Sequence, residues 1–376
     1  MAFVLPFELT HVRYAYPLWD YLGKHYSNIR VIRIHEDFFP DVDVETIILL
    51  AENYGGNTEV VDFAIYDSVA GLLGNKTSLY SQIKISDIIH RKKPFVYSLL
   101  NSSQHELLDS VRKKGITAPL IDYCKFRIGY VCADKDYFHP SKDTCIEYGI
   151  PNENLLPCIS NAKEINGGTG IGVVVSPGKS ASNLYLPKQL TAADKRYIKH
   201  GLDIGVNLRY KCKQRSPWYL TPSVDIPDLV LTVFGDAPKL IVNGGKYAVS
   251  NSLLAGFLSS GASGEQLICM WYNSLTLLSI ELNVHSLGGG VLVLIPGETD
   301  KLETIRAIPS EKAHEIFERI DECIKAQGIH AAYILGDELV LKKILGFSEE
   351  QIKTIRDAVS ALRFWRKTDM RRNKKR

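Results

Sequence analysis

The fold class is decided by the stretch Val44-Glu45-Thr46-Ile47-Ile48-Leu49-Leu50-Ala51, a nearly continuous apolar run. A run of this length and composition is typical of a strand buried on both faces of an α/β sheet. Two shorter apolar strands are predicted before it, at 2–5 and 31–34, with a helix over 11–25 between them. After turn residues at 53–57, residues 59–66 are predicted to return as the second strand of a hairpin.

This first part of the chain is incomplete as a domain. Its one predicted helix accompanies four apolar strands, whereas a doubly wound sheet carries helices on both faces. The remaining edge and face of the sheet would be exposed and prone to pair with another chain. Either later parts of this chain cover them, or a partner does.

The rest of the chain divides into two predicted regions. Residues 121–308 contain short strands, turns and many glycines and prolines, after a helix predicted over 104–114. Residues 309–376 are predicted to be helical, with one helix beginning near Asp337 and ending at Gly346, and a capping box at Ser348–Gln351. Helical spacing marks the apolar faces Ala313, Ile316, Phe317, Ile320, Ile324 and Ile352, Ile355, Val359, Leu362. The predicted fold is therefore α/β and α+β: a partial Rossmann-like sheet over 1–120, a mixed region over 121–308, and a helical segment over 309–376.

Composition places the protein among globular proteins. Of 376 residues, 45% are hydrophobic and 23% are charged, which excludes disorder and a small disulfide scaffold. No apolar run approaches the roughly 18 residues of a membrane span, and no basic segment precedes an apolar core at the start, so we expect a cytoplasmic protein.

The net charge of +3 combines a basic C-terminal tail with an acidic remainder of the chain. Residues 363–376 contain eight Lys or Arg and one Asp, so this tail carries +7 and the remaining 362 residues carry −4. Such a tail is either a solvated end or a contact to a polyanion, most often a nucleic acid.

Several stretches of the chain approximate catalytic or metal-binding motifs but do not match them. The glycines at 168–172 precede a predicted strand, and those at 172–180 have the wrong spacing for a phosphate-binding loop. The seven cysteines are widely spaced without a C-x-x-C pair, which predicts reduced thiols and no zinc site. A nuclease pattern is only loosely approximated by Pro227-Asp228 and by Asp236–Lys239. We therefore assign no catalytic, cofactor-binding or metal-ligating residue to this chain.

The best candidate site is the basic stretch from Arg209 to Tyr219. As a strand it would place Arg209, Lys211, Lys213 and Arg215 on one face, where like charges repel unless they meet an anion. Phosphates along a nucleic-acid backbone fit that need, and Trp218 and Tyr219 add stacking surface. The alternative is an exposed edge strand protected by charge.

Eight blocks occur along the chain in a characteristic order: residues 2–6, 37–39 with the strand 44–51, 126–139, where Cys132-Ala133 replaces Thr-Gly, 156–160, 209–219, 272–276, 286–292 and 339–366. In this order, the blocks resemble the C-terminal half of bacterial adenine-N6 DNA methyltransferases of restriction-modification type. The resemblance implies that 121–308 is a target-recognition domain that binds double-stranded DNA, and that Arg209, Lys211, Lys213, Arg215, Trp218 and Tyr219 lie at the DNA.

The family's cofactor-binding and catalytic motifs precede the strand at 2–5, and the chain contains no Pro-Pro dipeptide. The resemblance therefore implies a split enzyme, in which a partner protein binds S-adenosylmethionine and carries the catalytic Asn/Asp-Pro-Pro-Tyr/Phe motif. This chain would supply the last strands of the catalytic sheet and read the target while the adenine is flipped out. A non-enzymatic DNA-specificity or regulatory protein is the second hypothesis, and a nuclease is the third.

Overall fold

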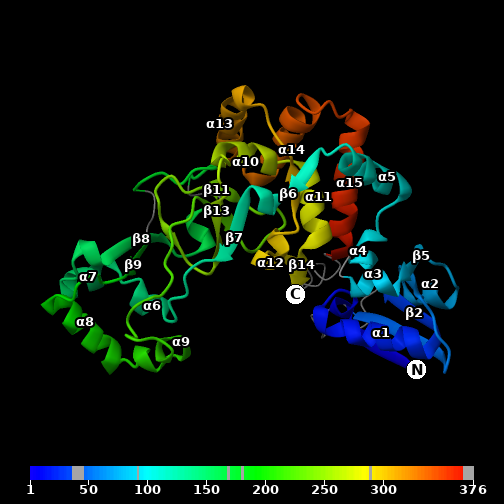
Figure 1. The fold of residues 1–376 in the computed structure, drawn as a ribbon, viewed down its shortest axis with the longest axis horizontal. Coiled ribbons are helices and arrows are strands. Elements are labelled where there is room, and N and C mark those ends of the chain that lie inside the picture. Colours follow the sequence, from blue (N-terminus) through cyan, green and yellow to red (C-terminus); the bar gives the residue numbers. More distant parts are fainter. Residues whose placement is uncertain (36–45, 91–92, 167–169, 179–181, 288–289, 367–376) are drawn as a thin grey trace. The chain divides into compact units, whose positions relative to one another are not determined.

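The computed structural model describes residues 1–35, 46–90, 93–166, 170–178, 182–287 and 290–366, and it forms two compact units (Figure 1). Unit 1 comprises 1–114, 278–293 and 353–376, and unit 2 comprises 115–277 and 294–352. The predicted boundaries at 120 and 308 divide the chain differently, since 278–293 belongs to unit 1 and 309–376 is shared between the units. Asp37-Phe38-Phe39, the glycines 168 and 288–289, Lys179-Ser180 and the tail from 367 lie outside the described residues.

Unit 1 is built on a five-stranded sheet in the order β1-β3-β2-β4-β5. The strands β1, β2 and β4 run in the same direction, because β2 pairs with β4 in parallel while β1 and β2 are both antiparallel to β3. The strands are β1 (Ala2–Pro6), β2 (Tyr26–Ile34), β3 (Thr46–Tyr54), β4 (Val60–Tyr66) and β5 (Leu79–Lys84). The first helices are α1 (Tyr16–His25), α2 (Val69–Leu73), α3 (Ile85–Ile89), α4 (Pro94–Tyr97) and α5 (Ser102–Lys113).

The predicted hairpin of β3 and β4 is wrong. Both strands form where the sequence analysis placed them, but β2 lies between them and pairs with each. The turn after β3 therefore carries the chain across β2 rather than folding it back on β3. Strand β2 is also longer than predicted, because it begins at Tyr26, directly after α1.

The two faces of this sheet are covered unequally. On one face the strands pack against buried side chains of α1, α3 and α4, among them Trp19, Ile88 and Phe95. On the other face a smaller cluster of Ile32, Ala64 and Tyr66 packs with Leu72 of the five-residue α2. The thin cover of this second face agrees with the predicted shortage of helices in the first part of the chain.

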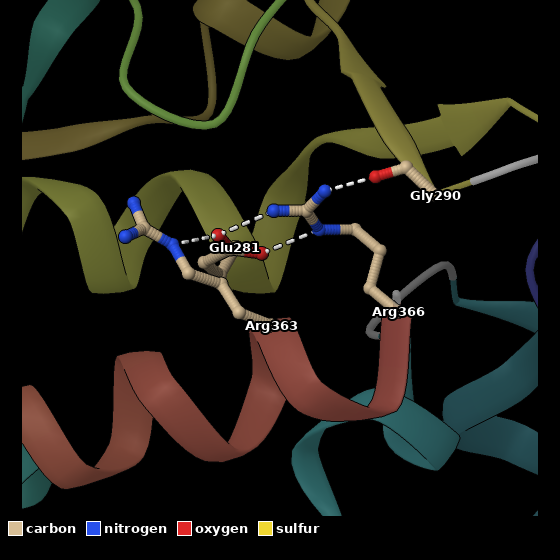
Figure 2. A network of polar contacts seen from close by, with 4 residues as sticks. All are labelled: Glu281, Gly290, Arg363 and Arg366. Atoms are coloured by element: carbon tan, nitrogen blue, oxygen red, sulfur yellow. Dashed lines mark hydrogen bonds and ion pairs between the residues drawn. The ribbon is translucent and has the colours of Figure 1, made fainter. Parts of the chain in front are cut away.

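The later segments of unit 1 are held by a buried ionic cluster. The segments are the end of α11 (Ser274–Asn283), β14 (His285–Leu287), β15 (Val291–Val293) and most of α15 (Glu349–Arg366). The Glu281 carboxylate, 1% exposed, accepts from Nε of Arg363 at 2.9 Å and from Nε and Nη2 of Arg366 at 2.9 Å each. Figure 2 shows both guanidinium groups directed at this one carboxylate, with Arg366 also donating to the carbonyl of Gly290. Glu281 thus ties α15 to α11.

We predict that Glu281→Gln lowers the free energy of unfolding of unit 1 by about 3–5 kcal/mol, because the buried Arg366 and the half-buried Arg363 lose their counter-charge. Urea unfolding of the purified variant measures this loss. Glu318→Gln is the control, since Glu318 is an exposed partner of His314 and its loss should change stability by less than about 1 kcal/mol. Equal effects of the two substitutions would contradict the role given to Glu281.

Unit 2 combines small sheets with helices. Its largest sheet has the order β11-β10-β13-β7, and a second sheet has the order β12-β8-β9. The strands are β6 (Thr117–Pro119), β7 (Cys124–Ile128), β8 (Leu155–Ile159), β9 (Ser182–Tyr185), β10 (Leu229–Thr232), β11 (Leu240–Val242), β12 (Ala248–Val249), β13 (Leu253–Leu258) and β16 (Glu303–Ile305). The helices are α6 (Lys135–Phe138), α7 (Lys142–Tyr148), α8 (Ala192–Asp203), α9 (Tyr210–Lys213), α10 (Gly264–Trp271), α12 (Pro296–Thr299), α13 (Ser310–Gln327) and α14 (Ile329–Gly336).

The structure confirms most of the prediction for the helical end of the chain. The five apolar positions of α13 are buried, and Ser348 and Gln351 form the predicted capping box at the start of α15. The helix predicted to begin near Asp337 instead begins at Ile329 as α14 and continues as a π-helix over Asp337–Lys342. None of the described helices is long and apolar enough to cross a membrane.

Candidate functional site

The predicted basic strand at 209–215 is wrong, because this stretch is helical. Arg209 is extended, and Tyr210–Lys213 form the short helix α9 after a 3-10 turn at Val206–Leu208. Gly205, with a φ of 73°, makes the left-handed bend that ends the preceding segment. The four basic residues therefore do not share one face of a strand.

The four cations have different surroundings. Lys211 and Lys213 are exposed, and Arg209 is exposed but lies 3.3 Å from the Asp134 carboxylate. Arg215 is half-buried and donates to the carbonyls of Val131 and Cys132, the latter at 3.2 Å. Arg215 therefore fixes the loop after β7, and only the other three cations are presented to solvent.

Trp218 and Tyr219 belong mainly to the packing of unit 2. The Trp218 ring lies 5.5 Å from the ring of Tyr137, and Gly201 of α8 leaves room for it, since a Cβ there would lie 2.5 Å from Trp218. Tyr219 contacts Trp218 edge-on and is half-buried. Trp218 is thus part of an aromatic core with Tyr137 and Tyr197.

We predict that Arg215→Gln lowers the free energy of unfolding of unit 2 by about 2 kcal/mol, because two carbonyls lose charge-assisted hydrogen bonds. Urea unfolding measures the loss, with the exposed Lys213→Gln as the matched control. If both variants were as stable as the wild type, Arg215 would be a surface cation like Lys213.

A second basic surface was not singled out from the sequence. Lys125 and Arg127 are exposed on β7, alternating with the buried Cys124 and Phe126. The Arg127 guanidinium lies 5.2 Å from the ring centre of Phe257, on the neighbouring strand β13. The period of two, with apolar Cys124 and Phe126 alternating with Lys125 and Arg127, is the signal in the sequence that predicts a shared exposed face for the two cations.

The turn after β7 keeps a conformation that favours glycine. Ala133 stands where the resemblance expects Gly, and it has a φ of 80°. A left-handed φ of this kind is strained for residues with a Cβ. The replacement of Thr-Gly by Cys132-Ala133 therefore leaves a left-handed residue at this position.

A loop of unit 2 is held by a buried lysine. The Lys239 ammonium, 3% exposed, donates to the carbonyls of Ile165 and Ile171 at 2.5 and 2.6 Å. Asp321 of α13 accepts from the main-chain N–H of Val173 at 2.7 Å. Burial lowers the pKa of Lys239 to about 8, and the Asp321 charge offsets part of this effect. Lys239 therefore holds the loop and is not available to a nuclease site, and Asp228 accepts from the main chain of Leu258.

We predict that the free energy of unfolding of the wild type rises between pH 8 and 10.5 relative to Lys239→Met, by up to about 3 kcal/mol. In this range the unfolded chain still holds the lysine proton that the folded chain has lost, so higher pH favours the folded state. Urea unfolding of both proteins at pH 8 and pH 10 measures the difference in the free energy of unfolding. Because both proteins contain the same cysteines, the effects of cysteine titration cancel in this difference. A parallel pH dependence of the two proteins would contradict a desolvated Lys239.

The cysteines are free thiols, and most are buried. Burial raises the pKa of Cys124 and of Cys158 to about 12, so both are poor nucleophiles near neutral pH. His139 has its Nε2 2.8 Å from the Tyr130 hydroxyl, and burial lowers the pKa of its imidazole. Within the described ranges, no three His, Cys, Asp or Glu side chains form a group that could hold a metal ion.

Unit 1 contains a pocket of about 50 Å³ at the carboxyl ends of its parallel strands. Phe7 directly follows β1 and Arg33 lies near the end of β2, while Glu281, His285 and Trp365 line the other side. The Arg33 guanidinium lies 4.6 Å from the ring centre of Phe7 and donates to the carbonyl of Trp365 at 2.7 Å. Ligands of α/β sheets bind at this edge, and in unit 1 the later segments line it.

Strand β1 is an open edge of the same sheet. It pairs with β3 on one side, and the described residues place no strand on its other side. Phe3 and Val4 point to opposite faces of the sheet, and their exposed fractions are 51% and 52%. Apolar side chains exposed on both faces of an edge strand are a template for pairing with another segment.

Comparison with known proteins places most of the chain in one family. The model of the "Type II methyltransferase M.Eco57I, C-terminal domain" matches residues 92–341. The Type II methyltransferase M.AccI of Acinetobacter calcoaceticus is 26% identical over 236 residues, which cover 58% of this chain and 42% of that protein. The chain thus spans less than half the length of this relative.

Two solved structures are similar to this chain at low sequence identity. The Type IIL restriction-modification enzyme MmeI, solved in complex with DNA, matches with a TM-score of 0.52 and 10% identity over 96% of this chain and 49% of that chain. The type IIG restriction endonuclease BpuSI matches with a TM-score of 0.48 and 13% identity over 98% and 47%. The likeness to MmeI confirms the predicted mixed α/β fold class.

Proposed function

Because this chain belongs to the family of the C-terminal domain of the Type II methyltransferase M.Eco57I, we propose that it is the DNA-recognition half of a split, site-specific adenine-N6 DNA methyltransferase. In this proposal unit 2 reads the target sequence, and a partner chain binds S-adenosylmethionine and carries the catalytic Asn/Asp-Pro-Pro-Tyr/Phe motif. The choice of adenine rests on the resemblance of the motifs.

The open edge of β1 is the observation that carries the proposal. The sheet of unit 1 lacks a covering neighbour beside Phe3 and Val4 within the described residues. A partner strand added there would bury both side chains and continue the sheet. If that strand ran parallel to β1, its carboxyl end would lie beside the pocket at Phe7, where a substrate base would meet the partner's catalytic motif.

DNA contact is assigned to the exposed cations of unit 2. Arg209, Lys211 and Lys213 on one surface and Lys125 and Arg127 on β7 would bind phosphates, which position a protein on DNA without reading its sequence. Bases would then be read in the grooves by side chains near these contacts. Arg215 and Trp218 contact other residues of unit 2, so their proposed role is to stabilise the structure beneath the exposed cations.

Co-expression tests the division of labour. The chain is purified alone and with the product of the adjacent upstream reading frame, and each preparation is incubated with DNA and S-adenosylmethionine. We expect N6-methyladenine, detected by mass spectrometry of the digested DNA, only when both proteins are present. Methyl transfer by the chain alone would contradict the split enzyme, and methylated cytosine would contradict the adenine assignment. DNA binding by the pair without transfer would favour a specificity or regulatory protein.

We predict that Val4→Pro abolishes co-purification with the partner and with it methyl transfer. Met1 and Ala51 exchange both main-chain hydrogen bonds, so the N–H groups of Phe3 and Leu5 face β3 and that of Val4 faces the open edge. Proline at position 4 therefore removes a donor that β3 does not use.

The matched control is Gln82→Pro on β5, the opposite edge of the same sheet. Ile85 donates to the carbonyl of Glu59, which by alternation turns the N–H of Gln82 outward. This variant should keep the partner. Equal partner binding by the two variants, pulled down and quantified on gels, would show that β1 is not the interface.

A further inference from the structure

An uninterrupted stretch of unit 2 exposes four large apolar side chains. Leu202 and Ile204 lie at the end of α8, and Leu208 and Tyr210 lie in the following turn and in α9, with exposed fractions rising from 46% for Leu202 to 71% for Tyr210. The 3-10 turn at Val206–Leu208 contacts both helices, so the four side chains belong to one local segment, the exposed apolar segment 202–210, in which Val206 is buried. Figure 1 labels α8 and α9, which flank it. Single exposed apolar residues are ordinary, but four so close in the chain make this segment a candidate surface for interaction.

The helix α9 places an aromatic ring between two cations. Cys212 is 1% exposed and fixes the side of this helix that faces the core. At about 100° per residue, Tyr210 then points away from the core, while Lys211 and Lys213 point to either side of it. The Lys211 ammonium lies 5.5 Å from the ring centre of Tyr210, in keeping with this arrangement.

The two lysines are not neutralised by acidic side chains of the protein. Asp134 lies at 3.3 Å from Arg209, whereas neither Lys211 nor Lys213 has a carboxylate partner among the described residues. The surface therefore combines exposed apolar groups with exposed positive charge, and a partner that is both apolar at its centre and anionic at its sides would complement it.

We propose that the exposed apolar segment 202–210 enters a groove of double-stranded DNA, with Leu208 and Tyr210 against bases and sugars and Lys211 and Lys213 on the phosphates at either side. The inference rests on the proposed function, because it takes DNA as the partner of unit 2. A DNA groove offers the surfaces of bases and sugars between two sugar-phosphate backbones, which matches an aromatic ring flanked by two cations. This inference adds contacts to bases and sugars to the phosphate contacts proposed above.

The salt dependence of DNA binding separates the two kinds of contact. The probe is a fluorescent duplex of about 30 base pairs with randomised sequence, and the protein is the complex with its partner, titrated between about 50 and 200 mM salt. Leu208→Ala with Tyr210→Ala should weaken binding about tenfold at each salt concentration and leave the slope unchanged, because no phosphate contact is lost. Lys211→Gln with Lys213→Gln should instead reduce the slope by about 2, at roughly 0.9 for each phosphate.

Two further variants exclude trivial effects. Ile146→Ala removes an apolar side chain of α7 that is 79% exposed in the same unit, and it should bind DNA like the wild type. Tyr210→Phe keeps the ring and should retain the affinity that the alanine variant loses. Thermal unfolding of every variant should match the wild type, since the altered side chains are exposed.

The outcomes distinguish this inference from the proposed function. If the wild-type complex binds DNA and the lysine variant loses slope, but the Leu208 and Tyr210 variant binds normally, groove insertion is overturned and DNA recognition stands. A reduced slope in the apolar variant would also overturn insertion, because these side chains would then act through the cations. If the wild-type complex does not bind DNA, the proposed function itself fails.

Discussion

Unit 1 depends on a buried carboxylate that two arginines must share. Glu281 accepts hydrogen bonds from Arg363 and Arg366, and neither Glu281 nor Arg366 could be buried without an opposite charge, since an unpaired charge in a protein interior is strongly unfavourable. The cluster fixes α15 against α11 and thereby brings Trp365 to Arg33, at the end of β2. Segments at 278–293 and 353–366, far along the chain from a first sheet that ends at Lys84, therefore complete the edge at which its parallel strands end.

The same sheet is closed at one side and open at another. The later segments cover the carboxyl ends of β1 and β2, whereas β1 itself exposes apolar side chains on both faces. A stable monomer rarely leaves such a strand unprotected, and β1 carries no lysine and only a terminal proline as protection. Within the described residues, the sheet of unit 1 thus has one edge strand available for pairing, while the ends of its parallel strands are covered.

Unit 2 packs part of its aromatic residues into a core and leaves other groups of the same stretch exposed. Tyr137, Tyr197 and Trp218 pack together, with Gly201 making room, and Arg215 fixes the loop that leads from β7 into this core. Tyr210, Lys211 and Lys213 are exposed. Residues of similar charge in the sequence, such as Arg215 and Lys213, thus divide between a half-buried structural position and an exposed one.

The sequence by itself determined the local features: the apolar strands of unit 1, the buried face of α13, the capping box at Ser348 and the ordered motifs that indicated the family. These follow from short-range periodicity and from side chains close in the sequence. Only the tertiary structure decided that β2 lies between β3 and β4, because strand order depends on long-range pairing that periodicity does not encode. It also decided that Tyr210–Lys213 form a helix that buries Cys212, so that Tyr210, Lys211 and Lys213 are exposed in different directions and the four cations do not share one face.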